Sequence, residues 1–331
     1  MRERGGMPAA RRFILAALLA GLTVAGCSSQ GGKAGAARKA GPDRGSMTVA
    51  MITHAAPGDA FWDIIRRGAE TAAAKQKLTL RYASDADGGG QATLVQNAID
   101  SRVDAIVVTL AKPDALDAVV KRAVASGIPV VVMNAGFDNW KQVGALGYFG
   151  SDDGVAGERA GKRAAEEGAR HVLCVSQEQG HVALEARCDG LKKGFGAGRF
   201  DKLYVLGTDM PSVRSTVAAK LRQDPSIDLV VTLGAPFAIT AIQAAKDAGS
   251  SAKIATFDTN PQSAAAIRSG ALQWAIDQQP YLQGYLSVEA LWLRKTNGHV
   301  IGGGEPVLTG PYFVDKTNVE EIAPLAAQGT R

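Results

Sequence analysis

The chain has 331 residues, of which 46% are hydrophobic, 21% charged and 6% aromatic, and its formal net charge is +5. This length favours two domains, and the apolar content together with the small net charge excludes an intrinsically disordered protein. No apolar run reaches the roughly 18 residues of a spanning helix, which excludes a multi-pass membrane protein.

The first residues have the pattern of an export signal. A basic stretch ends at Arg11-Arg12 and is followed by an apolar run over 13–22. This order is typical of a secretory signal peptide, and the paired arginines leave twin-arginine export open beside the general route. Four arginines against one glutamate place much of the positive charge in residues 1–26. The remaining balance does not favour nucleic acid as a partner.

The segment Val24-Ala25-Gly26-Cys27 resembles the lipobox of bacterial lipoproteins, in which small residues precede the cysteine that accepts the lipid. We therefore expect a signal peptide over 1–26 and lipidation at Cys27. Residues 27–46 are rich in Gly, Ala and basic residues without apolar periodicity, which predicts a flexible tether. Acyl chains on Cys27 would anchor the mature chain to the outer face of the membrane.

From residue 47 onward, short β-branched runs alternate with longer amphipathic stretches. The first half predicts strands over 47–53, 78–82, 105–110 and 130–133, and helices over 61–75, 91–101 and 114–126. After a pause at 148–153, the second half predicts helices over 154–167, 183–195, 211–222, 236–248, 261–269 and 281–296, with strands over 171–175, 203–206, 227–233, 253–257 and 271–277. Apolar strands between helices indicate parallel sheets covered on both faces. The sequence predicts two similar α/β units joined near residue 150.

Two glycine-rich runs do not make a nucleotide site. Gly88-Gly89-Gly90 lacks the dinucleotide fingerprint, and Gly157-x-x-x-Gly161-Lys162-Arg163 lacks the spacing and the hydroxyl residue of a P-loop.

Two cysteines lie beyond the predicted signal peptide and lipidation site. Cys174 lies in a strand-like run and Cys188 early in the next helix, so in an oxidising compartment they could close a small loop or remain as two buried thiols. The four histidines have no paired spacing, so we expect no metal and no cofactor.

In open α/β sheets, ligands bind outside the carboxyl ends of the strands. The polar and aromatic residues at those positions are His54, Asp59, Phe61, Trp62, Asn134, Glu178, Arg187, Asp258 and Gln278. This set contains no Ser-His-Asp order and no reactive cysteine, so no enzyme is predicted. Hydrogen-bonding groups beside aromatic faces suit a polyhydroxylated ring with an apolar C–H face.

Several of these motifs resemble the bacterial periplasmic sugar-binding proteins of ABC importers, in the ribose-binding-like branch of the type I solute-binding fold. Asp59-Ala60-Phe61-Trp62 resembles the first strand–helix turn of that family, where two aromatics stack on the sugar. Arg187-Cys188-Asp189-Gly190 resembles its Arg-x-x-Gly helix start, Ala255-Thr256-Phe257-Asp258 its Gly-Phe-Asp, and Gln278-Gln279-Pro280 its hinge motif. The resemblance covers residues 47–310.

The chain departs from the family pattern at the contact positions. Asp59 stands where the family has Asn, Asn134-Ala135 stands for Asp-Arg, Gly234-Ala235 for Asn-Asp, and Leu110 for Asn. These departures do not affect the expected fold, but they remove any specific expectation of ribose.

The resemblance implies two Rossmann-like lobes with parallel sheets, joined by a three-segment hinge. The N-terminal lobe would take 47–150 plus 280–307, and the C-terminal lobe 151–279 plus 308–331. A sugar or polyol would lie between the closing lobes, contacted by the residues collected above. The chain would then be a monomeric, lipid-anchored receptor that delivers its ligand to an ABC permease and its ATPase. Alternatives are a receptor that signals to a chemoreceptor or sensor kinase, and a non-sugar ligand such as a signalling furanone.

Three of the candidates also have a plainer interpretation. Asp59 is suited to cap the helix that follows it. His54 could orient its loop without touching a ligand. Adjacent helical residues point about 100° apart, so one of Phe61 and Trp62 could pack in the core.

Overall fold

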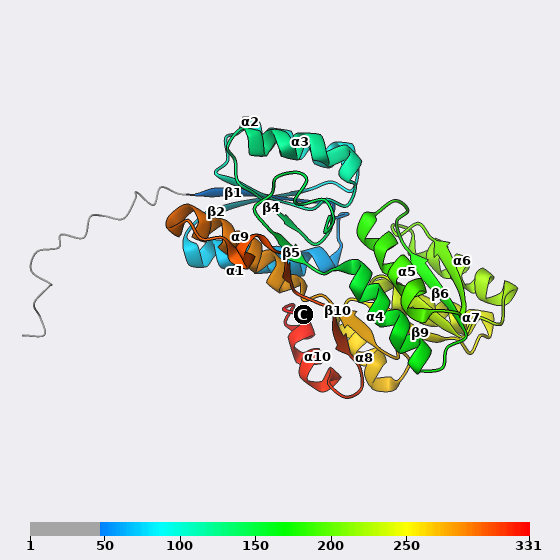
Figure 1. Cartoon of the computed structure of the whole chain (residues 1–331). Coiled ribbons are helices and arrows are strands. Elements are labelled where there is room, and N and C mark those ends of the chain that lie inside the picture. The colour runs from blue at the N-terminus through cyan, green and yellow to red at the C-terminus, as the bar shows by residue number, and fades with distance from the viewer. Residues whose placement is uncertain (1–46) are drawn as a thin grey trace, which may run out of the picture. The chain divides into compact units, whose positions relative to one another are not determined.

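The computed structural model describes residues 47–331 (Figure 1). The predicted signal peptide, the predicted lipidation site at Cys27 and the predicted tether lie outside the described residues. Among the helices described, none combines the length and the hydrophobicity needed to cross a bilayer.

The first of two six-stranded sheets has the order β11-β5-β4-β3-β1-β2, and every pairing in it is parallel. Its strands are β1 (Thr48–Thr53), β2 (Thr79–Ser84), β3 (Ala105–Val108), β4 (Val130–Met133), β5 (Tyr148–Gly150) and β11 (Val307–Leu308). One face packs against α2 (Gly88–Asp100) and α3 (Pro113–Ala125), and the other against α1 (Ala60–Gln76) and α9 (Pro280–Asn297) (Figure 1). Helices on both faces explain why β3 and β4 are entirely apolar and buried.

The second sheet has the order β12-β10-β9-β8-β6-β7, in which only β12 runs antiparallel to its neighbour. Its strands are β6 (His171–Ser176), β7 (Arg199–Tyr204), β8 (Leu229–Thr232), β9 (Lys253–Phe257), β10 (Ala275–Asp277) and β12 (Tyr312–Val314). One face packs against α4 (Asp153–Glu166) and α5 (Val182–Phe195). The other packs against α6 (Met210–Gln223), α7 (Ala235–Ala248), α8 (Pro261–Ser269) and α10 (Val319–Ala327).

The chain passes between the sheets three times: after β5, between β10 and α9, and between β11 and β12. The predicted two-lobed α/β fold is therefore confirmed. The pause at 148–153 contains the short strand β5, and the strand expected over 271–277 is limited to Ala275–Asp277. Elements of three residues are too short to give a periodic signal, which is also why β12 was not predicted.

Helices α4 and α5 pack through glycines. A Cβ at Gly157 would lie 2.2 Å from the carbonyl oxygen of Arg187, and one at Gly190 would lie 2.2 Å from the carbonyl oxygen of Gly154. Only glycine permits this approach of two backbones. The Gly157–Gly161 run that fails as a P-loop is thus a helix-packing stripe, and it sets the position of the turn that carries Arg187.

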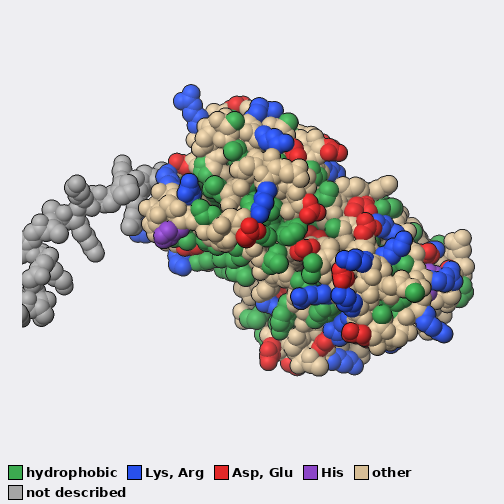
Figure 2. Space-filling model, in the orientation of Figure 1, with side chains coloured by type: hydrophobic (Ala, Val, Ile, Leu, Met, Phe, Trp, Pro, Cys, Tyr) green, Lys and Arg blue, Asp and Glu red, His purple; other side chains and the backbone are tan. Residues whose placement is uncertain are grey.

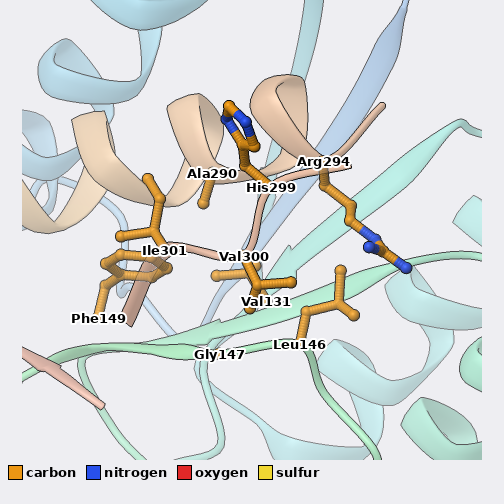
Figure 3. A pocket seen from close by; sticks show the side chains of 9 residues that line it. All are labelled: Val131, Leu146, Gly147, Phe149, Ala290, Arg294, His299, Val300 and Ile301. Atoms are coloured by element: carbon orange, nitrogen blue, oxygen red, sulfur yellow. The ribbon is translucent and has the colours of Figure 1, made fainter. Parts of the chain in front are cut away.

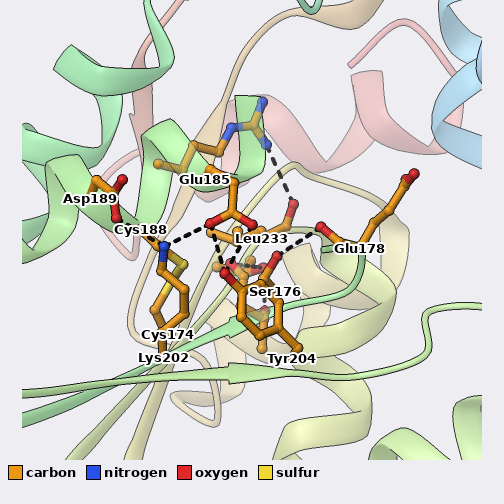
Figure 4. The surroundings of a disulfide bond; sticks show 12 residues. Cys174, Ser176, Glu178, Glu185, Cys188, Asp189, Lys202, Tyr204 and Leu233 are labelled. Atoms are coloured by element: carbon orange, nitrogen blue, oxygen red, sulfur yellow. Dashed lines mark hydrogen bonds and ion pairs between the residues drawn. A yellow bond between two sulfur atoms is a disulfide. The ribbon is translucent and has the colours of Figure 1, made fainter. Parts of the chain in front are cut away.

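Cys174 of β6 and Cys188 of α5 form a disulfide between the second sheet and its covering helix (Figure 4). Both cysteines are fully buried in the core beneath α4 and α5. Beside the disulfide, the Nζ of Lys202 lies 2.8 Å from Glu185 and 2.9 Å from Asp189 (Figure 4). The disulfide therefore fixes α5 to β6, the strand that precedes it in the chain.

Charged side chains of both signs are interspersed over the visible face, without a continuous basic patch (Figure 2).

Candidate functional site

Most of the predicted ligand residues lie where strands of the two sheets end. They are His54 after β1, Asn134 after β4, Glu178 after β6, Asp258 after β9 and Gln278 after β10. Asp59, Phe61 and Trp62 follow at the start of α1, and Arg187 lies in the second turn of α5. The carboxyl ends of both sheets therefore contribute to one candidate site.

Gln278 links the two lobes. The Nδ2 of Asn134 donates to the Oε1 of Gln278 at 3.1 Å, and the Nε2 of Gln278 donates to the Oδ1 of Asp258 at 2.7 Å. Asn134 and Asp258 follow corresponding strands in the two lobes, and both have a left-handed backbone, with φ of 64° and 67°. Asn and Asp tolerate this conformation better than most residues. The site is thus built around an amide bridge between two similar turns.

Two residues that sequence reasoning missed support this bridge. The Oε1 of Gln283 accepts a hydrogen bond from the Nδ2 of Asn134 at 3.1 Å. The hydroxyl of Thr309 donates to the carbonyl oxygen of Gln278 at 2.7 Å. Gln283 lies in the first turns of α9 and Thr309 directly after β11, so both belong to segments where the chain passes between the sheets.

Arg187 is buried and held by Asp153, a third residue that was not predicted. Its Nε donates to the Oδ1 of Asp153 at 2.7 Å, and its guanidinium lies over the ring of Phe257, 4.8 Å from the centroid. Burial raises the pKa of Asp153 to about 6 although Arg187 acts in the opposite direction. Asp153 comes from the 148–153 segment, which had no pattern to mark it. Within the described residues the Nη2 of Arg187 makes no hydrogen bond.

Asp258 has a carboxyl group that is only partly ionised near neutral pH. Burial raises its pKa to about 7, against the opposing effects of Arg187 and of the hydrogen bond from Gln278, and the charges of Asp277 and Asp59 add to the rise. Its Oδ2 accepts no hydrogen bond from the described residues, since Gln278 contacts only Oδ1. This oxygen is suited to accept a hydrogen bond from a ligand hydroxyl.

The two aromatics of α1 have different environments. Trp62 is 6% exposed and packs in the core below α1, with its ring edge-on to His54 at 4.7 Å. Phe61 is partly exposed and lies edge-on to Trp62 at 5.4 Å. Asp59 caps α1, because its Oδ1 accepts a hydrogen bond from the backbone N–H of Phe61 at 3.0 Å.

His54 and Glu178 take part in contacts between the lobes. The Nε2 of His54 lies 2.9 Å from the Nε2 of His181 at the start of α5, and Glu178 forms an ion pair with Lys112 at 2.8 Å. His181 was not predicted as a site residue, because its separation of 127 residues from His54 gives no spacing signal.

A backbone hydrogen bond joins the segment that carries Lys112 to the segment that carries His181. The N–H of Val182 donates to the carbonyl oxygen of Ala111 at 3.1 Å. The turn before α3 and the start of α5 are therefore in direct contact.

A third histidine lies in a cluster that the sequence did not indicate. His171, Asp201 and Asp224 bring one ligand atom each within 4.8 Å of one another. Lys220 lies 2.7 Å from Asp201 and Arg199 lies 3.1 Å from Asp224. Because both carboxylates already have cationic partners, the charge of this cluster is balanced without a metal ion.

Two hollows in the described part of the chain contain none of the predicted ligand residues. One, of about 10 Å³, lies between α9 and the first sheet and is lined by Val131, Leu146, Gly147, Phe149, Ala290, Arg294, His299, Val300 and Ile301 (Figure 3). It has room for about one water molecule. The other, of about 300 Å³, is an open surface hollow beside Arg163 and Asp315. Neither hollow therefore coincides with the candidate site.

The chain matches the family model of the periplasmic binding protein domain over residues 49–297. It is similar to a solved carbohydrate transporter from Acidothermus cellulolyticus in complex with myo-inositol, with 61% identity and a TM-score of 0.85, covering 86% of this chain and 100% of that one.

Two further relatives are more distant. A ribose import binding protein of Bacillus subtilis is 27% identical over 70% of this chain and 76% of its own length. A xylose/arabinose-binding protein of Sulfolobus acidocaldarius is 24% identical over 68% of this chain. The match spans 60% of the Sulfolobus protein, which is less than two thirds of its length.

Proposed function

The chain belongs to the periplasmic binding protein family, and on that premise we propose that it is an extracytoplasmic receptor for an uncharged cyclic polyol, with myo-inositol as the first candidate. The observation that carries the proposal is the 61% identity to a solved protein that holds myo-inositol, across the full length of that protein. Like the family, the chain binds its substrate without turning it over.

The side chains at the candidate site suit this ligand. The Oδ2 of Asp258 would accept from one hydroxyl, and the Nη2 of Arg187 would donate to another. Charge-assisted hydrogen bonds of this kind contribute roughly 1.5–3 kcal/mol each. Phe61 would cover the C–H face of the ring. Asn134 and Gln278 would complete the polar contacts from the two lobes.

The charges favour a neutral ligand over an anionic one. Arg187 is already paired with Asp153, and Asp59 and, when ionised, Asp258 add further negative charge to the site. A phosphate or carboxylate on the ligand would meet carboxylates without an uncompensated cation. We therefore expect this set of residues to disfavour phosphorylated inositols and sugar acids.

The ligand would be enclosed by movement of the lobes about the segments near 150, 279 and 308. We assign 47–150 plus 280–307 to the N-terminal lobe, and 151–279 plus 308–331 to the C-terminal lobe. Closure would remove water from the site and present both lobes to an ABC permease and its ATPase. The Val24–Cys27 motif supports lipid anchoring through Cys27 at the outer face of the membrane, and a monomer suffices for this role.

A thermal-shift panel tests the proposal. The protein would be heated with myo-inositol, ribose, xylose, arabinose, glucose and an inositol monophosphate. A ligand at 100 times its Kd stabilises the folded state by about 2.7 kcal/mol, which raises Tm by several degrees. We expect this rise with myo-inositol and none with its phosphate.

The variant Asp258→Ala should abolish the rise. The matched control Asp247→Asn changes an exposed carboxylate on α7 that is paired with Arg214, and it should leave the rise unchanged. A response that survives Asp258→Ala would place the ligand elsewhere.

A further inference from the structure

We propose that His54 and His181 form an acid-sensitive latch, a lobe-to-lobe hydrogen bond that holds the site closed only while both imidazoles are neutral. Its effect on ligand affinity rests on the proposed function, but the latch itself rests on the protein's own contacts.

The environment of Thr109 determines the tautomer of His54. The Oγ1 of Thr109 accepts a hydrogen bond from the backbone N–H of His54 at 3.2 Å and from the Nε2 of Gln91 at 3.0 Å. A hydroxyl oxygen has two lone pairs, so both are used. The hydroxyl hydrogen of Thr109 is then directed to the remaining close atom, the Nδ1 of His54, at 2.7 Å. His54 therefore carries its own proton on Nε2.

The tautomer of His54 in turn determines the tautomer of His181 in the other lobe. The Nε2–H of His54 donates to the Nε2 of His181, 2.9 Å away. His181 then carries its proton on Nδ1, an atom that is buried without a partner among the described residues. Gln91, Thr109, His54 and His181 thus form one directed chain of hydrogen bonds, and the interlobe link depends on a bare Nε2 on His181.

A further proton on either ring breaks this chain. On His181 it would occupy Nε2 and set two N–H groups against each other across 2.9 Å. On His54 it would occupy Nδ1 and oppose the hydroxyl of Thr109, whose lone pairs are taken. Neither imidazolium has a carboxylate hydrogen-bonded to it within the described residues.

The surrounding charges act in the same direction. Burial lowers the pKa of His54 well below its ordinary value, with smaller contributions from His181 and Lys112. Burial also lowers the pKa of His181 to about 3, with contributions from Arg187 and Lys112. Glu178 faces this edge as well, but it is paired with Lys112.

The sign of the pH effect follows from these shifts. When the lobes separate, the rings regain water and a pKa of about 6.5. The closed-state pKa values are lower, so the open state binds more protons in acid. The closed form is therefore fully favoured above about pH 6.5 and is lost progressively as the pH falls below that value.

Isothermal titration with myo-inositol at about pH 7.5 and about pH 5.5 tests the latch. Over this range each histidine should weaken binding about tenfold, and the pair about 100-fold. The double variant His54→Gln/His181→Gln keeps amides of similar reach that do not titrate, so its Kd should rise about 100-fold less than that of the wild type. Asp258 is unchanged in both proteins and cancels in this comparison.

Three controls keep the result interpretable. His299→Gln removes an exposed histidine and should retain the wild-type pH dependence. In each single variant the loss of affinity between about pH 7.5 and about pH 5.5 should be about tenfold smaller than in the wild type. The single variants serve as the test if the double variant does not fold. If acidification weakens binding equally in the wild type and in the His54 and His181 variants, the latch is contradicted.

Failure of the proposed function gives a different result. If myo-inositol does not bind near neutral pH, the ligand assignment is wrong, and the latch is tested by small-angle X-ray scattering of the ligand-free chain. The radius of gyration of the wild type should increase in acid while that of the double variant His54→Gln/His181→Gln stays constant. An equal response of the two proteins would contradict the latch.

Discussion

Asp258 combines a left-handed backbone with a carboxylate whose pKa burial raises to about 7. In the unfolded chain an aspartate titrates near 3.9, so between about pH 4 and pH 7 the folded state binds more protons at this site. The stability of the ligand-free protein should therefore fall as the pH rises through that window. A ligand hydroxyl that donates to Asp258 would offset this cost.

The variant Asp258→Asn isolates the effect. Asn tolerates the positive φ and still accepts the hydrogen bond from Gln278, but it carries no charge. We expect the variant to exceed the wild type in free energy of unfolding by about 1–3 kcal/mol at pH 8, and to match it near pH 4. It should also lose at least about tenfold in ligand affinity. Urea denaturation at both pH values measures the difference, and a constant offset between the two proteins would refute this assignment of the pKa.

Sequence reasoning located residues that follow strands and missed those that reach the site from a distance. Asp258 and Gln278 could be predicted, because the end of a parallel strand marks the ligand edge of the sheet. Asp153 and Gln283 could not, since each becomes relevant only through a partner far away in the chain, Arg187 and Asn134 respectively. His181 is the extreme case, because its partner lies in the other lobe.

At the scale of elements, the α4–α5 crossing connects stability to the binding site. Gly157→Ala would place a Cβ 2.2 Å from the carbonyl oxygen of Arg187, so α5 must move. Overpacking of this kind costs about 1–3 kcal/mol, and the displaced Arg187 should bind ligand more weakly.

The control for this variant lies on the same helix. A Cβ at Gly154 would meet the nearest side-chain atom, on Asp152, at 3.5 Å, so Gly154→Ala should be neutral or slightly stabilising. Thermal unfolding and titration of both variants test the difference. Equal stability of Gly157→Ala and the wild type would show that the helices are not held in contact here.

The disulfide also holds α5, which it joins to β6. It closes a loop with a sequence separation of 14, for which chain entropy predicts about 3 kcal/mol of stabilisation. A reducing agent should lower the Tm of the wild type towards that of Cys174→Ala/Cys188→Ala, and should leave the double variant unchanged. A wild-type Tm that does not respond to reductant during unfolding would contradict a structural role for the bond.

The alternation of strands and helices was enough to predict both lobes, since each long helix and apolar strand carries its own periodicity. The packing of α4 on α5 was not predictable, because a pair of glycines four residues apart fits several structures equally well. Only the tertiary contact between Gly157 and Arg187 distinguishes them.

For the molecule as a whole, two sheets place their strand ends around one site. The side-chain contacts between them include the amide of Gln278, the latch of His54 and His181, and the ion pair of Lys112 with Glu178. Two of these would break when the lobes separate, whereas Gln278 lies at a chain crossing. This division suits a receptor that opens at one edge and pivots at the other.

Isothermal titration of myo-inositol into the whole chain at neutral pH tests the central claim most directly. The account predicts one site per chain, a Kd that weakens strongly in Asp258→Ala, and no competition from an inositol monophosphate. The absence of measurable binding at millimolar myo-inositol, or tighter binding of the phosphate, would contradict it.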